Sequence, residues 1–141
     1  MDIEFGNLND LDTNDTGWFI GFSDWTKADP AKDVNLRFNP YGQEFSNLSA
    51  KWMHHIVGET RGLSKPISYG RTITMLMSDS GGFRIEFSSS SDFKSPDTHN
   101  YVLKKRGDFI AWGANLYHQA FVECDSTTLT IRWEPSKELS Q

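Results

Sequence analysis

The segment GDFIAWGANLYH, residues 107–118, decides how the chain folds. It holds an apolar run from Phe109 to Trp112, then Gly113 and Asn115, then a second strand-like run that begins at Tyr117. Glycine and asparagine adopt turn conformations more readily than most residues do. The segment therefore predicts two short strands joined by a tight turn.

Short strand-like runs of the same kind lie on both sides of this segment. Residues 71–77 and 83–87 flank the turn sequence SDSGG, residues 78–82, and this pattern predicts a β-hairpin. In the second arm Phe83, Ile85 and Phe87 share one face. Further runs cover residues 101–104, 117–123 and 127–133. Helical periodicity is not convincing anywhere, and strands at roughly 8–12-residue spacing are typical of an all-β sandwich or barrel.

The longest alternating segment is Leu48–Val57, and its two faces differ in polarity. One face holds Leu48, Ala50, Trp52, His54 and Ile56. The other holds Ser49, Lys51, Met53, His55 and Val57. If the first face packs in the core, Lys51 and His55 lie on the wetter face. The alternation alone does not decide which face borders an interior cavity.

Length and charge define the domain organisation that we expect. A chain of 141 residues fits one domain, and two separate cores would be crowded. Five acids and no base occur in the first 16 residues, which leaves 14 acids against 14 bases in the remainder. We expect a flexible acidic arm over residues 1–16, a β-barrel domain over 17–135 and a polar tail over 136–141.

Composition also argues against several classes of protein. The balanced charge beyond the arm makes general nucleic-acid binding unexpected. No apolar run approaches the ~20 residues that span a bilayer, and the N-terminus lacks the apolar stretch of a secretory signal. The lone cysteine, Cys124, excludes an internal disulfide framework and a cysteine-based zinc finger. We expect a cytoplasmic protein without membrane or nucleic-acid partners.

The segment at residues 107–118 resembles the second motif of the cupin superfamily. That motif is a glycine, five residues, Pro-x-Gly, two residues, a histidine, three residues and an asparagine. Two positions match and three are replaced: Gly107 and His118 match, Gly113 stands for the proline, Asn115 for the second glycine and Val122 for the asparagine. The resemblance covers about residues 71–133. It implies a double-stranded β-helix, the cupin jelly roll, and pairing into a homodimer.

The first cupin motif, which supplies three metal ligands in the family, is not matched. Counting back from Gly81 places its glutamate at Thr74 and its histidines at Ile67 and Tyr69, or one residue later at Ser68 and Gly70. None of these is a usual metal ligand. A two-histidine site remains an alternative, formed by His118 with His54 or His55, either with or without Glu59. The sequence leaves the metal and any other cofactor unknown.

Five residues are candidates for a site inside the barrel. The resemblance places His118 in the barrel interior as a base, ligand or substrate donor, with Ala120 and Val122 on the same face. Arg84 and Arg132 have the planar guanidinium that suits an anionic ligand, although Arg84 with Glu86 is more often an exposed ion pair. Trp112 could stack on a ligand at the barrel mouth, and His55 could face it from the long strand.

Three functional hypotheses follow from these residues. The first is a cupin-like protein that binds a small polar or anionic molecule in the barrel, with metal-independent acid–base chemistry of the isomerase kind. The second is a metal-dependent, oxygenase-like enzyme with a non-standard ligand set. The third is a non-catalytic dimeric interaction module with a filled barrel. An open cavity that contains His118 with Arg84 or Arg132 favours the small-molecule-binding hypothesis. A cavity in which His118 and a second histidine can share a metal ion favours the metal-dependent hypothesis.

Overall fold

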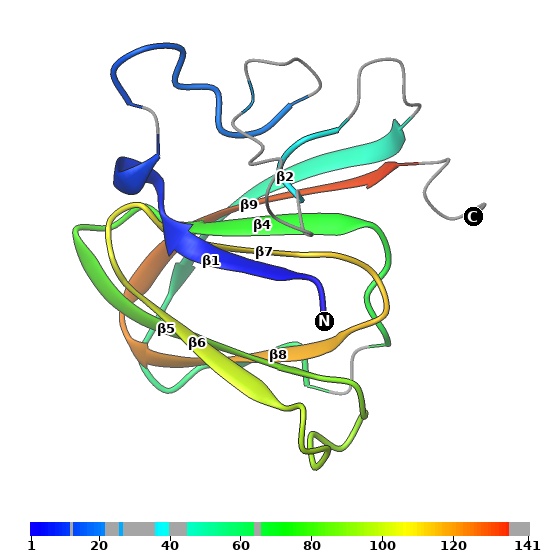
Figure 1. The fold of residues 1–141 in the computed structure, drawn as a ribbon. Helices are drawn as coiled ribbons and strands as arrows, with labels where there is room; N and C mark the ends of the chain where they lie inside the picture. The colour runs from blue at the N-terminus through cyan, green and yellow to red at the C-terminus, as the bar shows by residue number, and fades with distance from the viewer. Residues whose placement is uncertain (12, 22–25, 27–35, 40–44, 64–65, 136–141) are drawn as a thin grey trace.

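The computed structural model describes residues 1–11, 13–21, 26, 36–39, 45–63 and 66–135 (Figure 1). These residues form β-strands and a single short 3-10 helix. The strands are β1 (Ile3–Asn7), β2 (Phe45–His55), β3 (Thr60–Arg61), β4 (Arg71–Leu76), β5 (Ser80–Ser88), β6 (His99–Lys105), β7 (Asp108–Trp112), β8 (Tyr117–Cys124) and β9 (Ser126–Pro135), and the 3-10 turn is η1 (Leu8–Asp10). No helix in this part of the chain is long and apolar enough to cross a membrane.

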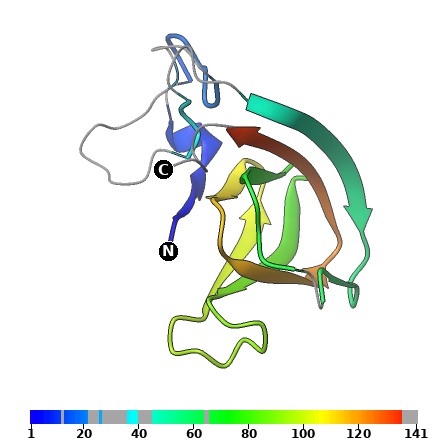
Figure 2. The same ribbon diagram turned by 90° about the vertical axis from the view of Figure 1, so that its right-hand side faces the viewer.

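The strands form two antiparallel sheets with the strand order of a jelly roll. The five-stranded sheet has the order β1-β7-β4-β9-β2, and the four-stranded sheet has the order β3-β8-β5-β6. From β2 to β9, every connection except β5–β6 crosses from one sheet to the other. The two sheets face each other, as Figures 1 and 2 show. This order confirms the predicted all-β, double-stranded β-helix.

The predicted hairpin between residues 71–77 and 83–87 is wrong, because its two strands lie in different sheets. β4 is paired on both sides, with β7 and β9, so it has no free edge for β5. The turn between them crosses from one sheet to the other and is tightly packed. A Cβ at Gly81 would lie 2.7 Å from the Ser126 hydroxyl, and one at Gly82 would lie 2.9 Å from the Cys124 amide nitrogen. The two glycines permit this close crossing, and a hairpin would have the same sequence signature.

The apolar core between the sheets contains Phe83, Ile85 and Phe87 from β5, as the alternation predicts. It continues with Leu76, Leu103, Ile110, Trp112, Leu116, Ala120 and Val122. On the far side of β5, Arg84 and Glu86 face outward, only partly buried. The core therefore occupies one part of the space between the sheets, and the rest is left for polar side chains.

A second apolar cluster covers the outer face of the five-stranded sheet. Ile73, Met75, Phe109, Ala111 and Trp133 form its base, and Leu8, Leu11, Phe19, Ile20 and Leu36 pack against it. Both faces of β7 are covered as a result, and all five of its residues are buried. These described residues before β2 thus form an outer layer over the five-stranded sheet.

The expected flexible arm is tied to this sheet over part of its length. β1 pairs with β7 from Ile3 to Asn7. The Arg37 guanidinium lies 2.9 Å from the Glu4 carboxylate, and both side chains are largely buried. Arg37 also donates a hydrogen bond to the Phe19 carbonyl at 2.7 Å. The predicted tail at residues 136–141 lies outside the described residues, and the predicted domain boundaries remain predictions.

We expect Ile85→Ala to lower the free energy of unfolding by about 2–5 kcal/mol, because it leaves a cavity in a packed interior. Ile85 is 2 % exposed. The matched control is Ile56→Ala, the same change at a residue that is 63 % exposed, for which we expect less than about 1 kcal/mol. Urea unfolding followed by circular dichroism measures both. Equal losses would contradict the placement of β5.

Candidate functional site

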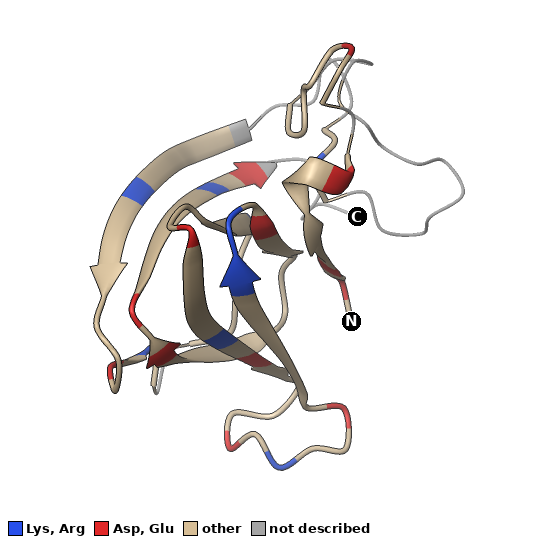
Figure 3. Ribbon diagram, turned by 90° about the vertical axis from the view of Figure 1, so that its left-hand side faces the viewer, with Lys and Arg blue, Asp and Glu red and all other residues tan. Residues whose placement is uncertain are grey.

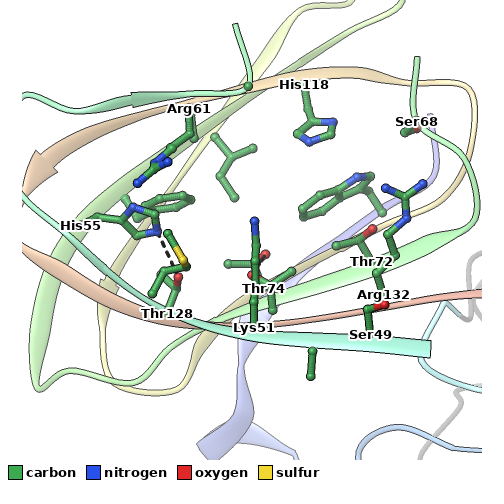
Figure 4. A pocket seen from close by; sticks show the side chains of 18 of the residues that line it. Ser49, Lys51, His55, Arg61, Ser68, Thr72, Thr74, His118, Thr128 and Arg132 are labelled. Carbon is green, nitrogen blue, oxygen red and sulfur yellow. Dashed lines mark hydrogen bonds between the residues drawn. The ribbon is translucent and has the colours of Figure 1, made fainter. Parts of the chain in front are cut away.

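A cavity of about 690 Å³ lies between the two sheets, next to the apolar core (Figure 4). This volume is within the range of small-molecule sites, roughly 300–1,000 Å³. Its lining residues come from both sheets and from the segment before β4. They are Ser49, Ala50, Lys51, Met53, His55, Arg61, Gly62, Pro66, Ile67, Ser68, Tyr69, Thr72, Thr74, Phe83, Ile85, Trp112, His118, Ala120, Thr128, Thr130 and Arg132.

The orientation of β2 settles which face of the long alternating strand borders the cavity. Ser49, Lys51, Met53 and His55 line it. On the other face Trp52 is 54 % exposed. The more polar face therefore points inward and the more apolar face points out. β2 is the edge strand of its sheet, so hydrophobicity alone could not orient it.

Threonines form the cavity wall on β4 and β9. Thr72 and Thr74 alternate with the buried Ile73 and Met75. On the neighbouring strand β9, Thr130 pairs with Thr74, and Thr128 lines the cavity beside them. The hydroxyls of Thr74 and Thr130 are 2.9 Å apart and share a hydrogen bond. β-Branched threonine suits a strand and also presents a hydroxyl. This wall therefore offers hydroxyl groups to the cavity, and no carboxylate among the described residues that line it.

His55 lies at the end of β2 and is 6 % exposed. Its Nδ1 is 3.4 Å from the Glu59 carboxylate, and its Nε2 is 3.3 Å from the Thr128 hydroxyl. Its ring centroid is 4.8 Å from that of Phe83. Burial lowers the pKa of His55 below its ordinary value of 6.5, and the hydrogen bond with Glu59 opposes that shift. His55 is therefore a neutral imidazole at neutral pH.

Glu59 holds the carboxylate that faces His55. Its Oε1 accepts a hydrogen bond from the Ile56 amide at 3.1 Å, and its Oε2 is 3.4 Å from the Arg61 guanidinium. The bond from the Ile56 amide is the main cause that lowers the pKa of Glu59, so the carboxylate is charged at neutral pH. A charged carboxylate at Nδ1 favours the tautomer that carries its proton there and leaves Nε2 as the basic nitrogen.

His118 reaches the cavity from β8 in the opposite sheet, as predicted, and Figure 4 shows its ring directed into the cavity. Its ring centroid is 5.1 Å from that of the buried Trp112. Ala120 lies on the same cavity face. Gln119 faces away and donates to Glu86 at 2.6 Å on the outer surface. His118 therefore lies where the apolar core meets the cavity, in contact with Trp112.

The charge of the cavity is one-sided. Lys51, Arg61 and Arg132 are among its described lining residues, whereas no aspartate or glutamate is. Figure 4 shows Arg61 beside His55 and Arg132 at the other end, near Ser68. Arg132 also donates to the Tyr69 carbonyl at 2.8 Å, which holds its side chain along this wall. Such a cavity attracts anions.

Four of the five predicted site residues line this cavity, and Arg84 does not. His118, His55, Trp112 and Arg132 do. Arg84 lies on the outer face of the four-stranded sheet, where its Nε is 3.2 Å from the Glu123 carboxylate and its guanidinium lies 4.4 Å from the Phe121 ring centroid. It alternates with the core residues Phe83 and Ile85, so it must point outward. The prediction that Arg84 lines the barrel cavity is therefore wrong.

Several site residues were missed by sequence reasoning. Arg61 carries no motif and reaches the cavity from β3, a strand of only two residues. The paired threonines had a signal in their alternation with apolar residues at 71–76 and 127–131, but threonine is common in strands of all kinds. Lys51 was assigned to the wetter face of its strand, and that face is the cavity wall.

The alternative two-histidine site is tested by the position of the histidines. His54 lies on the outer side of β2, where its Nδ1 is 2.9 Å from the Thr127 hydroxyl. Only His55 of this adjacent pair shares the cavity with His118. Among the described residues, no three histidine, cysteine, aspartate or glutamate side chains come together in a group that could hold a metal ion.

Comparisons with known proteins find similarity only among solved structures. No protein-family model matches the chain, and no curated protein does. One similar structure is the WlaRB TDP-quinovose 3,4-ketoisomerase from Campylobacter jejuni, with a TM-score of 0.45 and 13% identity over 61% of each chain. Another is the sugar 3,4-ketoisomerase QdtA from Thermoanaerobacterium thermosaccharolyticum in complex with TDP, with a TM-score of 0.45 and 14% identity over 68% of this chain and 62% of that one.

These matches span about three-fifths of each solved chain. Identities this low transfer no activity or ligand to the present chain.

We expect His55 to make the protein less stable as pH falls below about 6.5. Its lowered pKa means that the unfolded chain binds a proton more readily, so the stability due to neutral His55 is present above pH 6.5 and is lost as pH falls toward the folded-state pKa. Unfolding free energies at about pH 7.5 and 5.5 should therefore differ less in His55→Gln than in the wild type. His54→Gln, on the outer face of the same strand, should keep the wild-type difference. An unchanged difference in His55→Gln would contradict this assignment.

Proposed function

We propose that this protein is a cupin-like jelly-roll protein that binds a small anionic molecule between its sheets and performs metal-independent acid–base chemistry of the isomerase kind on it. One observation carries the proposal. The described lining of the cavity holds three cationic side chains and two histidines, and no carboxylate. The volume of about 690 Å³ leaves room for a ligand, which favours this function over an interaction module with a filled interior.

The anionic part of the ligand binds at the Arg132 end of the cavity. The guanidinium offers planar, bidentate hydrogen bonding, which suits a carboxylate or a phosphate. Lys51 adds a second positive charge nearby. It lies on β2, the strand next to β9, two residues after Ser49, and Ser49 pairs with Arg132. The walls on this side are polar, with the hydroxyls of Ser49, Ser68 and Thr72. The apolar part of the ligand packs against Trp112, whose ring borders both the cavity and the core.

The two histidines supply the acid–base groups from two sides. His118 acts as the base that removes a proton from the hydroxyl-bearing carbon of an α-hydroxy carbonyl compound; the electron pair of that C–H bond forms a C=C bond and the carbonyl π pair moves to oxygen, which gives an enediolate. A nearby cation, Arg61 or Lys51, stabilises the negative charge on the oxygen. Return of the proton to the neighbouring carbon completes the isomerisation without loss of any atom. His55 is neutral and is oriented by its contact with Glu59. It takes the proton from the ligand's hydroxyl oxygen and returns it to the other oxygen of the enediolate.

Removal of the Arg132 charge should weaken anion binding. We expect inorganic pyrophosphate to bind to the wild type by isothermal titration calorimetry, and Arg132→Gln to weaken it by about ten- to a hundred-fold, the effect of one lost charged hydrogen bond. Arg84→Gln, the same change on the outer face, should bind as the wild type does. Equal binding by the two variants, or no binding of any small anion by the wild type, would show that the cavity does not have this role.

His118→Ala should abolish chemistry and preserve the fold. The assay is exchange of the carbon-bound proton of a phosphorylated α-hydroxyketone in deuterated water, followed by proton NMR, because enediolate formation precedes isomerisation. We expect exchange in the wild type and in His54→Ala, and none in His118→Ala. The unfolding free energy of His118→Ala should fall by less than the about 2–5 kcal/mol expected for Ile85→Ala. A loss as large as that of Ile85→Ala would make His118 a structural residue.

A further inference from the structure

The register of β2 and β9 brings His55 and Thr128 together on the cavity face. Ser126 of β9 lies opposite His55 of β2. Thr128 is two residues further along β9, so it is a diagonal neighbour of His55 on the same face of the sheet, within reach of an aromatic side chain. Both residues line the cavity, and the His55 Nε2 is 3.3 Å from the Thr128 hydroxyl oxygen (Figure 4).

Both ring nitrogens of His55 therefore have a partner. Nδ1 is 3.4 Å from the Glu59 carboxylate, and Nε2 faces the Thr128 hydroxyl. Because the charged carboxylate favours the proton on Nδ1, the lone pair of Nε2 accepts the hydrogen bond that Thr128 donates. Contacts of this length are common before a ligand binds, and they tighten in the complex. A ligand in the cavity can thus reach the basic nitrogen through the Thr128 hydroxyl, without displacing either partner.

The surroundings of Thr128 leave His55 as its base. β9 has no charged residue between Ser126 and Arg132, and the neighbouring strands β2 and β4 contain no aspartate or glutamate (Figure 3). Thr128 and His55 are 1 % and 6 % exposed, and the ring centroid of Phe83 is 4.8 Å from that of His55. Within these three strands, His55 is therefore the group that can take a proton from Thr128.

We propose that Thr128 is a catalytic residue that relays a proton between the hydroxyl oxygen of the ligand and Nε2 of His55. The relay rests on the proposed function, in which His55 moves this proton. A hydroxyl can donate one proton and accept another at the same time. Thr128 Oγ takes the proton of the ligand while its own proton passes to Nε2, so Oγ never becomes an alkoxide. The reverse transfer gives a proton to the other oxygen of the enediolate and restores neutral His55, and no atom or electron is gained or lost.

The relay divides the two proton transfers of the reaction between the two sheets. His118 of the four-stranded sheet moves the proton on carbon, and Thr128 with His55 of the five-stranded sheet moves the proton on oxygen. Without the relay, His118 can still form the enediolate and return a proton to the same carbon. Only completion of the isomerisation needs the transfer between the two oxygens. Loss of Thr128 should therefore separate exchange at carbon from isomerisation.

The test measures both processes in one sample of the full chain. The probe is dihydroxyacetone phosphate in deuterated water, and proton NMR follows deuterium entering its hydroxyl-bearing carbon and the aldose phosphate that forms. Thr128→Val keeps the shape of the side chain and removes the hydroxyl. We expect it to lower isomerisation by about 100-fold and to leave exchange within about three-fold of the wild type, since acid–base groups contribute about this much to a rate. Thr128→Ser, which keeps a hydroxyl, should restore most of the isomerisation.

Thr127→Val is the matched control. Thr127 is the next residue of the same strand, and its hydroxyl is 2.9 Å from Nδ1 of His54 on the outer side of β2. This variant should isomerise the probe as the wild type does. His55→Gln should have the same defect as Thr128→Val, and the two substitutions together should cost no more than either alone, because both break one relay.

Nitrogen NMR of the free protein at neutral pH tests the hydrogen bond without a ligand. The signals of His55, assigned with His55→Gln, should show a protonated Nδ1 and an unprotonated Nε2, and Thr128→Val should shift the Nε2 signal. A proton on Nε2 would overturn the relay, because Thr128 could not then donate to it. Unchanged isomerisation in Thr128→Val, beside exchange in the wild type, would overturn the relay and leave the proposed function standing. Absence of exchange in the wild type would overturn both.

Discussion

The two-residue period of a β-strand is the constraint on which this structure depends. β4 lies in the middle of its sheet, and it directs Thr72 and Thr74 into the cavity. The same backbone must then direct Ile73 and Met75 to the outer face. A polar cavity wall in a central strand therefore requires an apolar cover on the other side of the sheet.

Five described apolar residues from the N-terminal part of the chain supply that cover. Leu8, Leu11, Phe19, Ile20 and Leu36 pack on the outer face, and buried polar contacts hold them there. Asn39 is one such contact. Its side-chain oxygen accepts from Trp133 at 3.0 Å and from Arg71 at 3.2 Å. The two apolar clusters thus lie on opposite sides of one sheet, and the cavity borders only the inner one.

Burial beside the cavity determines the protonation state of His55. His55 is buried beside Phe83, so its protonation is costly, yet Glu59 lies at its Nδ1 and favours the protonated form. Burial is the larger effect, and the ring stays neutral. His118 lies against Trp112 and borders the same space from the other sheet. The site thus combines the neutral imidazole of His55, the imidazole of His118 and cationic side chains in one cavity.

The sequence by itself determined the all-β class and the face of β5 that packs in the core, and the family resemblance placed His118 and Ala120 on the cavity face of β8. Alternation along a single strand is a local property, and the spacing from Gly107 to His118 places the histidine on its strand. It could not determine that β4 and β5 belong to different sheets, because a turn between sheets and a hairpin turn share the same glycines. The sequence also could not show which face of β2 borders the cavity, or that Arg84 lies outside the cavity. Both points depend on which face of a strand meets the opposite sheet. The tertiary structure decided these points, because sheet pairing and the direction of the cavity are contacts between residues far apart in the chain.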